Sequence, residues 1–388
     1  MNEFDDIRPY DDSEISAVVA RLAADRELAD IILRYSKPRL PKLFYPLLRP
    51  LVARKIKQLF AGVEDVAAYQ KVMAIFLDNV LQKSADGVTY SGLEQLDFSG
   101  GMLFLSNHRD IAMDPAMVAR GLVEQGQTPM LIAIGDNLLQ RPYASDLMRA
   151  NRSFLVKRAP GGRREKMAAL NQLSRFIRVQ RLEHSENVWI AQREGRAKDS
   201  NDFTDTALLK MLALSRASKE IGVAEAVLQL RIVPVAVSYE YDPCDLDKAR
   251  ELYQRSVHGK YDKQPGEDLR SIYKGISGFK GRIHIAFGEV LPTALADDDA
   301  IAAEVDRQIH TRYRLFPSNL LAFERQGGDI SAFHTRFELE EWQRKRSEFD
   351  QRFALVPVAH RDFWLNSYAN PVRNYLAATA VAGVDAAQ

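Results

Sequence analysis

Short apolar runs rich in β-branched residues alternate with helix-length segments through the middle of this sequence. The runs are Met102–Leu105, Met130–Ile134, Phe154–Val156, Val188–Ala191, Ile232–Val237 and Ile283–Phe287. Each run has the length and composition of a buried strand. The intervening segments 114–124, 163–180 and 206–229 are long enough for helices. This alternation predicts an α/β fold with a mixed, largely parallel sheet flanked by helices.

Helical segments are predicted on both sides of this region. Residues 13–35 read as one helix with Ser13 as a cap, and residues 43–60 as two short amphipathic helices broken by prolines. Beyond Pro292, residues 297–313 and 332–353 read as helices, and 377–388 as a frayed tail. We therefore expect an N-terminal helical region at 1–86, an α/β domain at 87–295 and a C-terminal helical extension at 296–388.

Composition limits the class of protein further. Every apolar stretch is interrupted by charged residues or Asn before it reaches the length of a membrane span. The acidic start lacks the features of a secretory signal, so we expect a cytoplasmic protein. Cys244 is the single cysteine, and the histidines lack metal-ligand spacing, so no disulfide or metal site is predicted. A net charge of +1 argues against a nucleic-acid partner.

A basic segment stands out against this balanced charge. The segment from Ile31 to Val63 contains no acidic residue, and its basic residues alternate with aromatic and apolar side chains such as Phe44 and Leu47. The eight bases are Arg34, Lys37, Arg39, Lys42, Arg49, Arg54, Lys55 and Lys57. This combination predicts docking on an anionic membrane surface. The alternative is a helical subdomain that packs on the sheet with its bases exposed to solvent.

One histidine follows the first of these apolar runs, within the segment Leu105-Ser-Asn-His-Arg-Asp-Ile-Ala-Met-Asp-Pro115. A histidine at a strand-to-helix turn can be oriented and made basic by a carboxylate, and His108 has Asp110 and Asp114 nearby. This arrangement suits a general base that acts on a hydroxyl group. The ordinary alternative for such a pair is a surface histidine beside a helix cap.

Three further segments follow the histidine in a fixed order. They are Ser153–Arg158, a strand that ends in basic residues, then Gln192-Arg-Glu-Gly-Arg196, and then Ile232-Val-Pro-Val235. With the histidine segment, they resemble the four blocks of the glycerol-3-phosphate and 1-acylglycerol-3-phosphate acyltransferase superfamily, over roughly residues 88–290.

The sequence departs from the pattern of that superfamily at two places. The aspartate of the first block stands five residues after the histidine, but Met113 occupies this position. We favour Asp114 as the orienting carboxylate, because its Asp-Pro step can open the following helix, while Asp110 remains the rival. In the third block, Gln192-Arg193 replaces the usual Phe-Pro, although the Glu-Gly-Arg core is retained.

The resemblance implies roles for the residues of these blocks. His108 would be the general base, and a set of neighbouring residues would bind substrate: Asn107, Arg109, Lys157, Arg158, Glu194, Gly195 and Arg196. Arginine side chains bind phosphate through two parallel hydrogen bonds, so Arg158 and Arg196 would carry an anion cradle. Glu194 would position Arg196 or a substrate hydroxyl, or would form an ordinary salt bridge.

The resemblance further implies transfer of a fatty acyl group from acyl-CoA or acyl carrier protein to a hydroxyl of glycerol 3-phosphate or a lysophospholipid. No cofactor is implied. We expect such an enzyme to work in phospholipid biosynthesis, as a peripheral protein at the inner face of the membrane. Two alternatives stay open at this point: a non-catalytic peripheral lipid-binding protein and a thioester hydrolase.

Overall fold

The computed structural model describes residues 3–37, 39–139, 141–158, 161–264 and 266–382. By its contacts the chain divides into two compact units. The first unit comprises Met1–Asn79 and Met130–Phe176, and the second comprises Val80–Pro129 and Ile177–Gln388. The predicted division at residues 86 and 295 follows the kinds of elements along the chain instead of its contacts, and it remains a prediction.

Seven strands form one mixed, largely parallel sheet in the order β1-β7-β6-β2-β5-β3-β4. The strands are β1 (Val88–Ser91), β2 (Leu103–Ser106), β3 (Leu131–Gly135), β4 (Ser153–Val156), β5 (Val188–Ala191), β6 (Ile232–Tyr239) and β7 (Ile283–Phe287). β3 and β4 belong to the first unit and the other five strands to the second. β6 and β7 pair antiparallel, whereas β1 with β7, β2 with β5 and with β6, and β3 with β4 pair in parallel. The sheet confirms the predicted fold class, and all six predicted runs lie on strands.

The central strands of the second unit are buried along their whole length. All residues of β2 and β6 are buried, as expected for strands that are covered on both faces. Ser106 at the end of β2 pairs with Val235, and β6 continues past this point to Tyr239. The carboxyl end of β6 therefore extends beyond the turn that follows β2.

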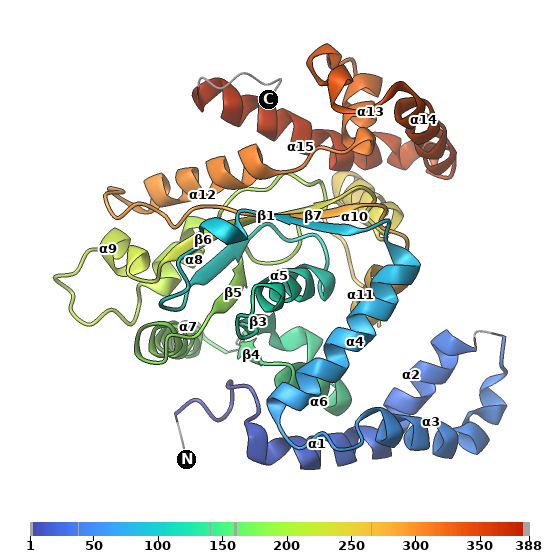
Figure 1. Cartoon of the computed structure of the whole chain (residues 1–388), viewed down its shortest axis with the longest axis vertical. Coiled ribbons are helices and arrows are strands. Elements are labelled where there is room, and N and C mark those ends of the chain that lie inside the picture. Colours follow the sequence, from blue (N-terminus) through green and yellow to red (C-terminus); the bar gives the residue numbers. More distant parts are fainter. Residues whose placement is uncertain (1–2, 38, 140, 159–160, 265, 383–388) are drawn as a thin grey trace. The chain divides into compact units, whose positions relative to one another are not determined.

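Helices cover the sheet of the second unit on both faces. These helices are α5 (Met113–Glu124), α8 (Thr206–Leu212), α9 (Val223–Leu228), α10 (Asp245–His258), α11 (Glu267–Ser277) and α12 (Asp298–Arg312). α12 and α5 lie on opposite sides of β6 and β7 (Figure 1). The segment 206–229 is helical at both ends, since the chain leaves α8 after Leu212 and enters α9 at Val223. The Ser218 side chain accepts the amide of Glu220 there, which favours a turn over a helix.

The second unit ends in a helical cluster, α13 (Pro317–Arg325), α14 (Leu339–Ala354) and α15 (Arg361–Ala382). Its core contains Trp364 and Tyr368, whose ring centroids are 4.7 Å apart. The prediction of a helix over 332–353 is wrong at its start, where Ser331–Arg336 form a 3-10 helix before α14. α15 also includes residues 377–382, where the sequence predicts a tail, and residues 383–388 lie outside the described residues.

The first unit contains α1 (Asp12–Ala24), α2 (Arg26–Ser36), α3 (Tyr45–Leu59), α6 (Pro142–Ala150) and most of α4 (Val66–Ser84) and α7 (Arg163–Arg178). The single helix predicted over 13–35 is wrong, because Asp25 is extended and its side chain accepts the amide of Leu28, which starts a new helix. Asp11, not Ser13, caps α1.

Most of the segment 43–60 forms one α-helix, α3, preceded by the 3-10 helix Lys42–Phe44, instead of the two short amphipathic helices predicted from its prolines. Pro46 lies in the first turn, where its missing amide costs no helical hydrogen bond, and Pro50 is accommodated inside the helix. Tyr45, Val52 and Ile56 on the inner face of α3 enter the core of the first unit. Among the described residues, no helix is both long and apolar enough to span a bilayer.

Candidate active site

The turn after β2 carries the candidate catalytic histidine and is fixed to β6. Asn107 is fully buried, and its side-chain oxygen accepts the Val237 amide at 2.7 Å. Its side-chain nitrogen donates to the Val237 carbonyl at 3.0 Å. Asn107 thus replaces the backbone pairing that ends at Ser106, and it sets the direction in which the turn leaves the sheet. The substrate contact predicted for Asn107 remains a prediction.

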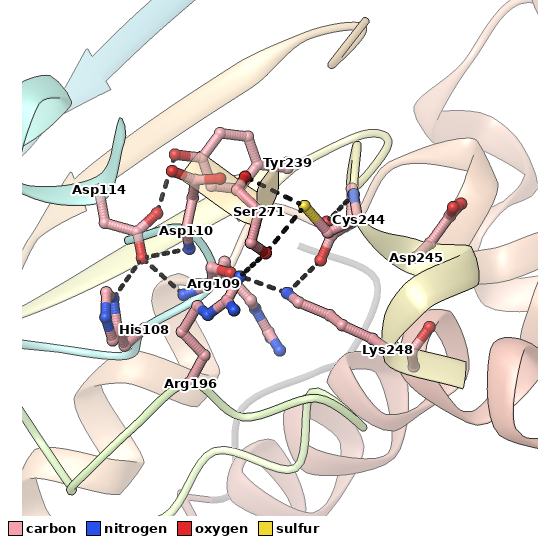
Figure 2. A network of polar contacts seen from close by, with 12 residues as sticks. His108, Arg109, Asp110, Asp114, Arg196, Tyr239, Cys244, Asp245, Lys248 and Ser271 are labelled. Carbon is pink, nitrogen blue, oxygen red and sulfur yellow. Dashed lines mark hydrogen bonds and ion pairs between the residues drawn. The ribbon is translucent and has the colours of Figure 1, made fainter. Parts of the chain in front are cut away.

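His108 and Asp114 form a hydrogen-bonded pair across this turn (Figure 2). His108 Nδ1 lies 2.9 Å from Asp114 Oδ2, and the side chains are 14% and 0% exposed. Because the aspartate can only accept when ionised, Nδ1 carries the proton and Nε2 keeps a free lone pair. Among the described residues, none hydrogen-bonds to Nε2. The pair therefore presents a nitrogen that can accept a proton.

Asp114 is held by more than the histidine. Its Oδ2 also accepts the backbone amides of Arg109 at 2.5 Å and Asp110 at 2.9 Å, and its Oδ1 accepts the Tyr239 hydroxyl at 2.8 Å. Hydrogen bonds of this kind favour the ionised carboxylate and fix its orientation. Asp114 lies in the first turn of α5, where the helix dipole also favours a negative charge.

Asp110 makes different contacts. Its Oδ1 accepts the amides of Ala112 at 3.0 Å and Met113 at 2.9 Å, so it shapes the turn that leads into α5. Burial, with the nearby Asp114 charge, raises the pKa of Asp110 above its usual value. The described contacts of its carboxylate do not include His108. The geometry therefore favours Asp114 over Asp110 as the orienting group.

The Arg109 side chain points into the protein. It is buried, and its guanidinium lies 2.5 Å from Asp202 Oδ2 and over the ring of Tyr313. Its carbonyl accepts Lys248 Nζ at 2.7 Å, and Lys248 in turn pairs with Asp242. Arg109 thus anchors the candidate catalytic turn through its side chain, which pairs with Asp202, and through its carbonyl, which accepts from Lys248. A direct contact of Arg109 with substrate remains a prediction.

The third block brings Arg196 to the catalytic turn. After β5, Gly195 adopts a φ of 76°, a left-handed conformation that favours glycine. The next residues then approach the histidine, since the Ala197 amide donates to the His108 carbonyl at 3.1 Å. Arg196 is half-buried beside this turn and donates to Ser271 Oγ at 3.0 Å (Figure 2). Glu194 is exposed, and its predicted role remains a prediction.

Lys157 and Arg158 follow β4 in the first unit. Lys157 pairs with Asp6 and donates to Gln172 at 3.4 Å, while the Arg158 amide donates to Asp136 at 3.1 Å. The N-terminal segment thus supplies the nearest carboxylate of Lys157. A common cradle of these two residues with Arg196 remains a prediction.

Sequence reasoning missed several groups around the turn. One of them is Tyr239, whose side chain is buried and whose hydroxyl donates to Asp114. The position of Tyr239 just after the predicted strand Ile232–Val237 was the sequence signal that could have pointed to this role. Lys248 on α10 and Gly275 on α11 carry no such signal. A Cβ on Gly275 would lie 1.8 Å from Asp110 Oδ2, so only glycine allows α11 this close to the turn.

Comparison with known families decides the class of this site. Residues 87–238 match the family model described as Acyltransferase. This segment, which is less than half of the chain, is therefore similar to that family. The match confirms the resemblance predicted from the four blocks, and it includes the candidate catalytic turn, Arg196 and most of β6.

The chain also aligns with solved structures, among them an enzyme of lipid metabolism. The crystal structure of the 1-acyl-sn-glycerophosphate (LPA) acyltransferase PlsC from Thermotoga maritima aligns at 11% identity and a TM-score of 0.36, covering 74% of this chain and 95% of that one. At these values the likeness does not bear on what this chain acts on. No curated protein matches the chain. Within the described part of the chain, no group of three His, Cys, Asp or Glu side chains is placed to hold a metal ion.

Proposed function

We propose that this acyltransferase moves a fatty acyl group from acyl-CoA or acyl carrier protein to a hydroxyl of glycerol 3-phosphate or a lysophospholipid, in phospholipid biosynthesis. The observation that carries the proposal is the His108–Asp114 pair, whose Nε2 bonds to none of the described residues, with Arg196 beside the same turn. A base for a hydroxyl and a cation for a phosphate are the two groups that such an acceptor requires.

In the proposed reaction, His108 Nε2 removes the proton of the acceptor hydroxyl as its oxygen attacks the thioester carbonyl. The tetrahedral intermediate then collapses with cleavage of the carbon–sulfur bond, and the imidazolium returns the proton to the leaving thiolate. Asp114 stabilises the imidazolium and holds the ring in one tautomer, as a buried aspartate does in hydrolytic triads. The acyl group passes directly to the acceptor, without an acyl-enzyme.

The acceptor phosphate is proposed to bind Arg196. This side chain is half-buried and donates one hydrogen bond to Ser271, which holds the guanidinium near the turn. Held there, the acceptor reacts in an oriented complex instead of by chance collision.

Membrane docking is proposed through a surface of the first unit that we call the leucine ridge, formed by Leu43, Leu47 and Leu51. These side chains are 83%, 72% and 57% exposed. Leu47 and Leu51 lie on one face of α3, four residues apart, and Leu43 lies in the 3-10 helix Lys42–Phe44 that precedes α3. Arg54 and Lys55 are exposed one turn further along α3. Arg49 differs from these two bases, because its guanidinium forms a bidentate ion pair with the carboxylate of Asp30. An apolar face with flanking bases suits the inner, anionic surface of a membrane.

The test is release of free thiol from acyl-CoA and from acyl carrier protein, with and without a panel of lysophospholipids and glycerol 3-phosphate. We expect release that depends on an acceptor and is abolished in His108→Ala, while that variant keeps the unfolding temperature of the parent. Release without any acceptor would identify a thioester hydrolase instead. Lipid binding without release of thiol from either donor would identify a non-catalytic lipid-binding protein.

A further inference from the structure

The extra residue between His108 and the orienting carboxylate changes how that carboxylate must be held. Met113 stands at the position of the family aspartate, and it is buried as the first residue of α5. Asp114 instead reaches His108 from the second position of the helix. Its carboxylate meets three donors on the His108 side, all of them through Oδ2.

In the part of the chain that the structure describes, the second oxygen of Asp114 has one donor, which comes from β6. Tyr239 is the last residue of that strand, and its hydroxyl lies 2.8 Å from Asp114 Oδ1. Both side chains are buried, so water does not offer Oδ1 an easy replacement. Tyr239 reaches this place because β6 continues beyond the pairing of Val235 with Ser106. The hydroxyl thus closes the side of Asp114 that faces away from His108 (Figure 2).

We infer that Tyr239 is a positioning residue that makes the six-residue His108–Asp114 spacing competent for catalysis. By fixing Oδ1, it stops the carboxylate from rotating about its Cβ–Cγ bond, so that Oδ2 stays on the imidazole. The hydrogen bond from Tyr239 also draws negative charge of the carboxylate toward Oδ1, which weakens the electrostatic attraction between Asp114 and the imidazolium.

The tyrosine can fill this role over the whole working range of pH. Burial, followed by the charge of Asp114, raises the pKa of Tyr239 well above its usual value. The hydroxyl consequently stays protonated and remains a donor whenever Asp114 is ionised. Neither Arg109 nor Lys248 offers an alternative, since the first pairs with Asp202 and the second with the Arg109 carbonyl and Asp242.

The inference rests on the proposed function for its kinetic part alone. Tyr239→Phe removes the hydroxyl and keeps the ring. Tyr241→Phe is the matched control, because Tyr241 is also buried, lies two residues further along and bonds Glu348 instead of the pair. We expect kcat to fall on the order of ten- to a hundred-fold in Tyr239→Phe, the range for a lost hydrogen bond to a charged group. The KM values for donor and acceptor should change little.

The pH dependence separates positioning from general support of the fold. In Tyr239→Phe the acidic limb of the kcat/KM profile should move to higher pH, because the unshared Asp114 charge stabilises the imidazolium more strongly. Tyr241→Phe should leave this limb in place. A loss of turnover with an unmoved limb, or no loss at all, overturns the inference.

A measurement without substrate keeps the inference testable if turnover is absent. The His108 imidazole is followed by NMR across pH, and its resonance is assigned by its disappearance in His108→Ala. We expect its titration midpoint to move upward in Tyr239→Phe and not in Tyr241→Phe. An unmoved midpoint refutes the role of Tyr239, whereas a shifted midpoint in a protein with no acyl transfer refutes the proposed function alone.

Discussion

Replacement of Asp114 by asparagine tests the centre of the proposed mechanism. Asparagine has nearly the same shape, but it carries no charge and turns one oxygen into a donor. With its remaining oxygen toward the amides of Arg109 and Asp110, it can keep those two hydrogen bonds. The stabilisation of the imidazolium is then lost while the turn is preserved.

The size of the loss follows from the geometry of the pair. His108 Nδ1 and Asp114 Oδ2 are 2.9 Å apart, which puts the two charge centres about 4 Å from one another. At an effective dielectric constant of about 20 this attraction is about 4 kcal/mol, or about a thousandfold in rate. We therefore expect kcat of Asp114→Asn to fall about a thousandfold, with little change in either KM.

Asp110→Asn is the matched comparison. Its Oδ1 accepts two backbone amides, and the asparagine oxygen can accept both of them. We expect a loss below about tenfold, since a neutral hydrogen bond contributes about 1 kcal/mol. The assay is acceptor-dependent thiol release at saturating donor, with thermal unfolding as the control for folding. Equal losses in the two variants, or a larger loss in Asp110→Asn, would refute the assignment of Asp114.

Three further predictions concern the cradle, the ridge and the pH dependence of stability. Arg196→Ala should raise the KM for a phosphate-bearing acceptor and leave the KM for donor nearly unchanged, whereas Arg193→Ala, exposed in the same block, should alter neither in steady-state assays. Leu47→Ser should weaken co-sedimentation with anionic vesicles, and Leu355→Ser, equally exposed at 72%, should not; a parent that stays in the supernatant refutes docking. Burial and the charge of Arg314 lower the pKa of His284 to about 4. The imidazole of His284 therefore binds a proton more tightly in the unfolded chain than in the folded one. As the pH is lowered from about 6.5 to 4, the free energy of unfolding should fall by up to about 3 kcal/mol. Denaturant titrations should show a smaller fall in His284→Gln.

Local patterns in the sequence identified six of the seven strands and the candidate catalytic turn, but not β1. Runs such as Met102–Leu105 and Ile232–Val237 are apolar throughout because central strands are covered on both faces. Such a strand can therefore be recognised from its own residues, without knowledge of its neighbours. The order of the four blocks likewise pointed to the acyltransferase family. Helix boundaries were less visible, since the break at Asp25 depends on a side-chain hydrogen bond that competes with helix continuation.

Tertiary structure decided how the histidine is supported. Both Asp110 and Asp114 are near His108 in the sequence, and only the course of the turn into α5 puts one of them on Nδ1. Tyr239 follows 125 residues after Asp114, and the register between β2 and β6 brings them together. Lys248 reaches the Arg109 carbonyl from 139 residues away. Such contacts depend on the placement of whole strands and helices, which no local pattern of residues encodes.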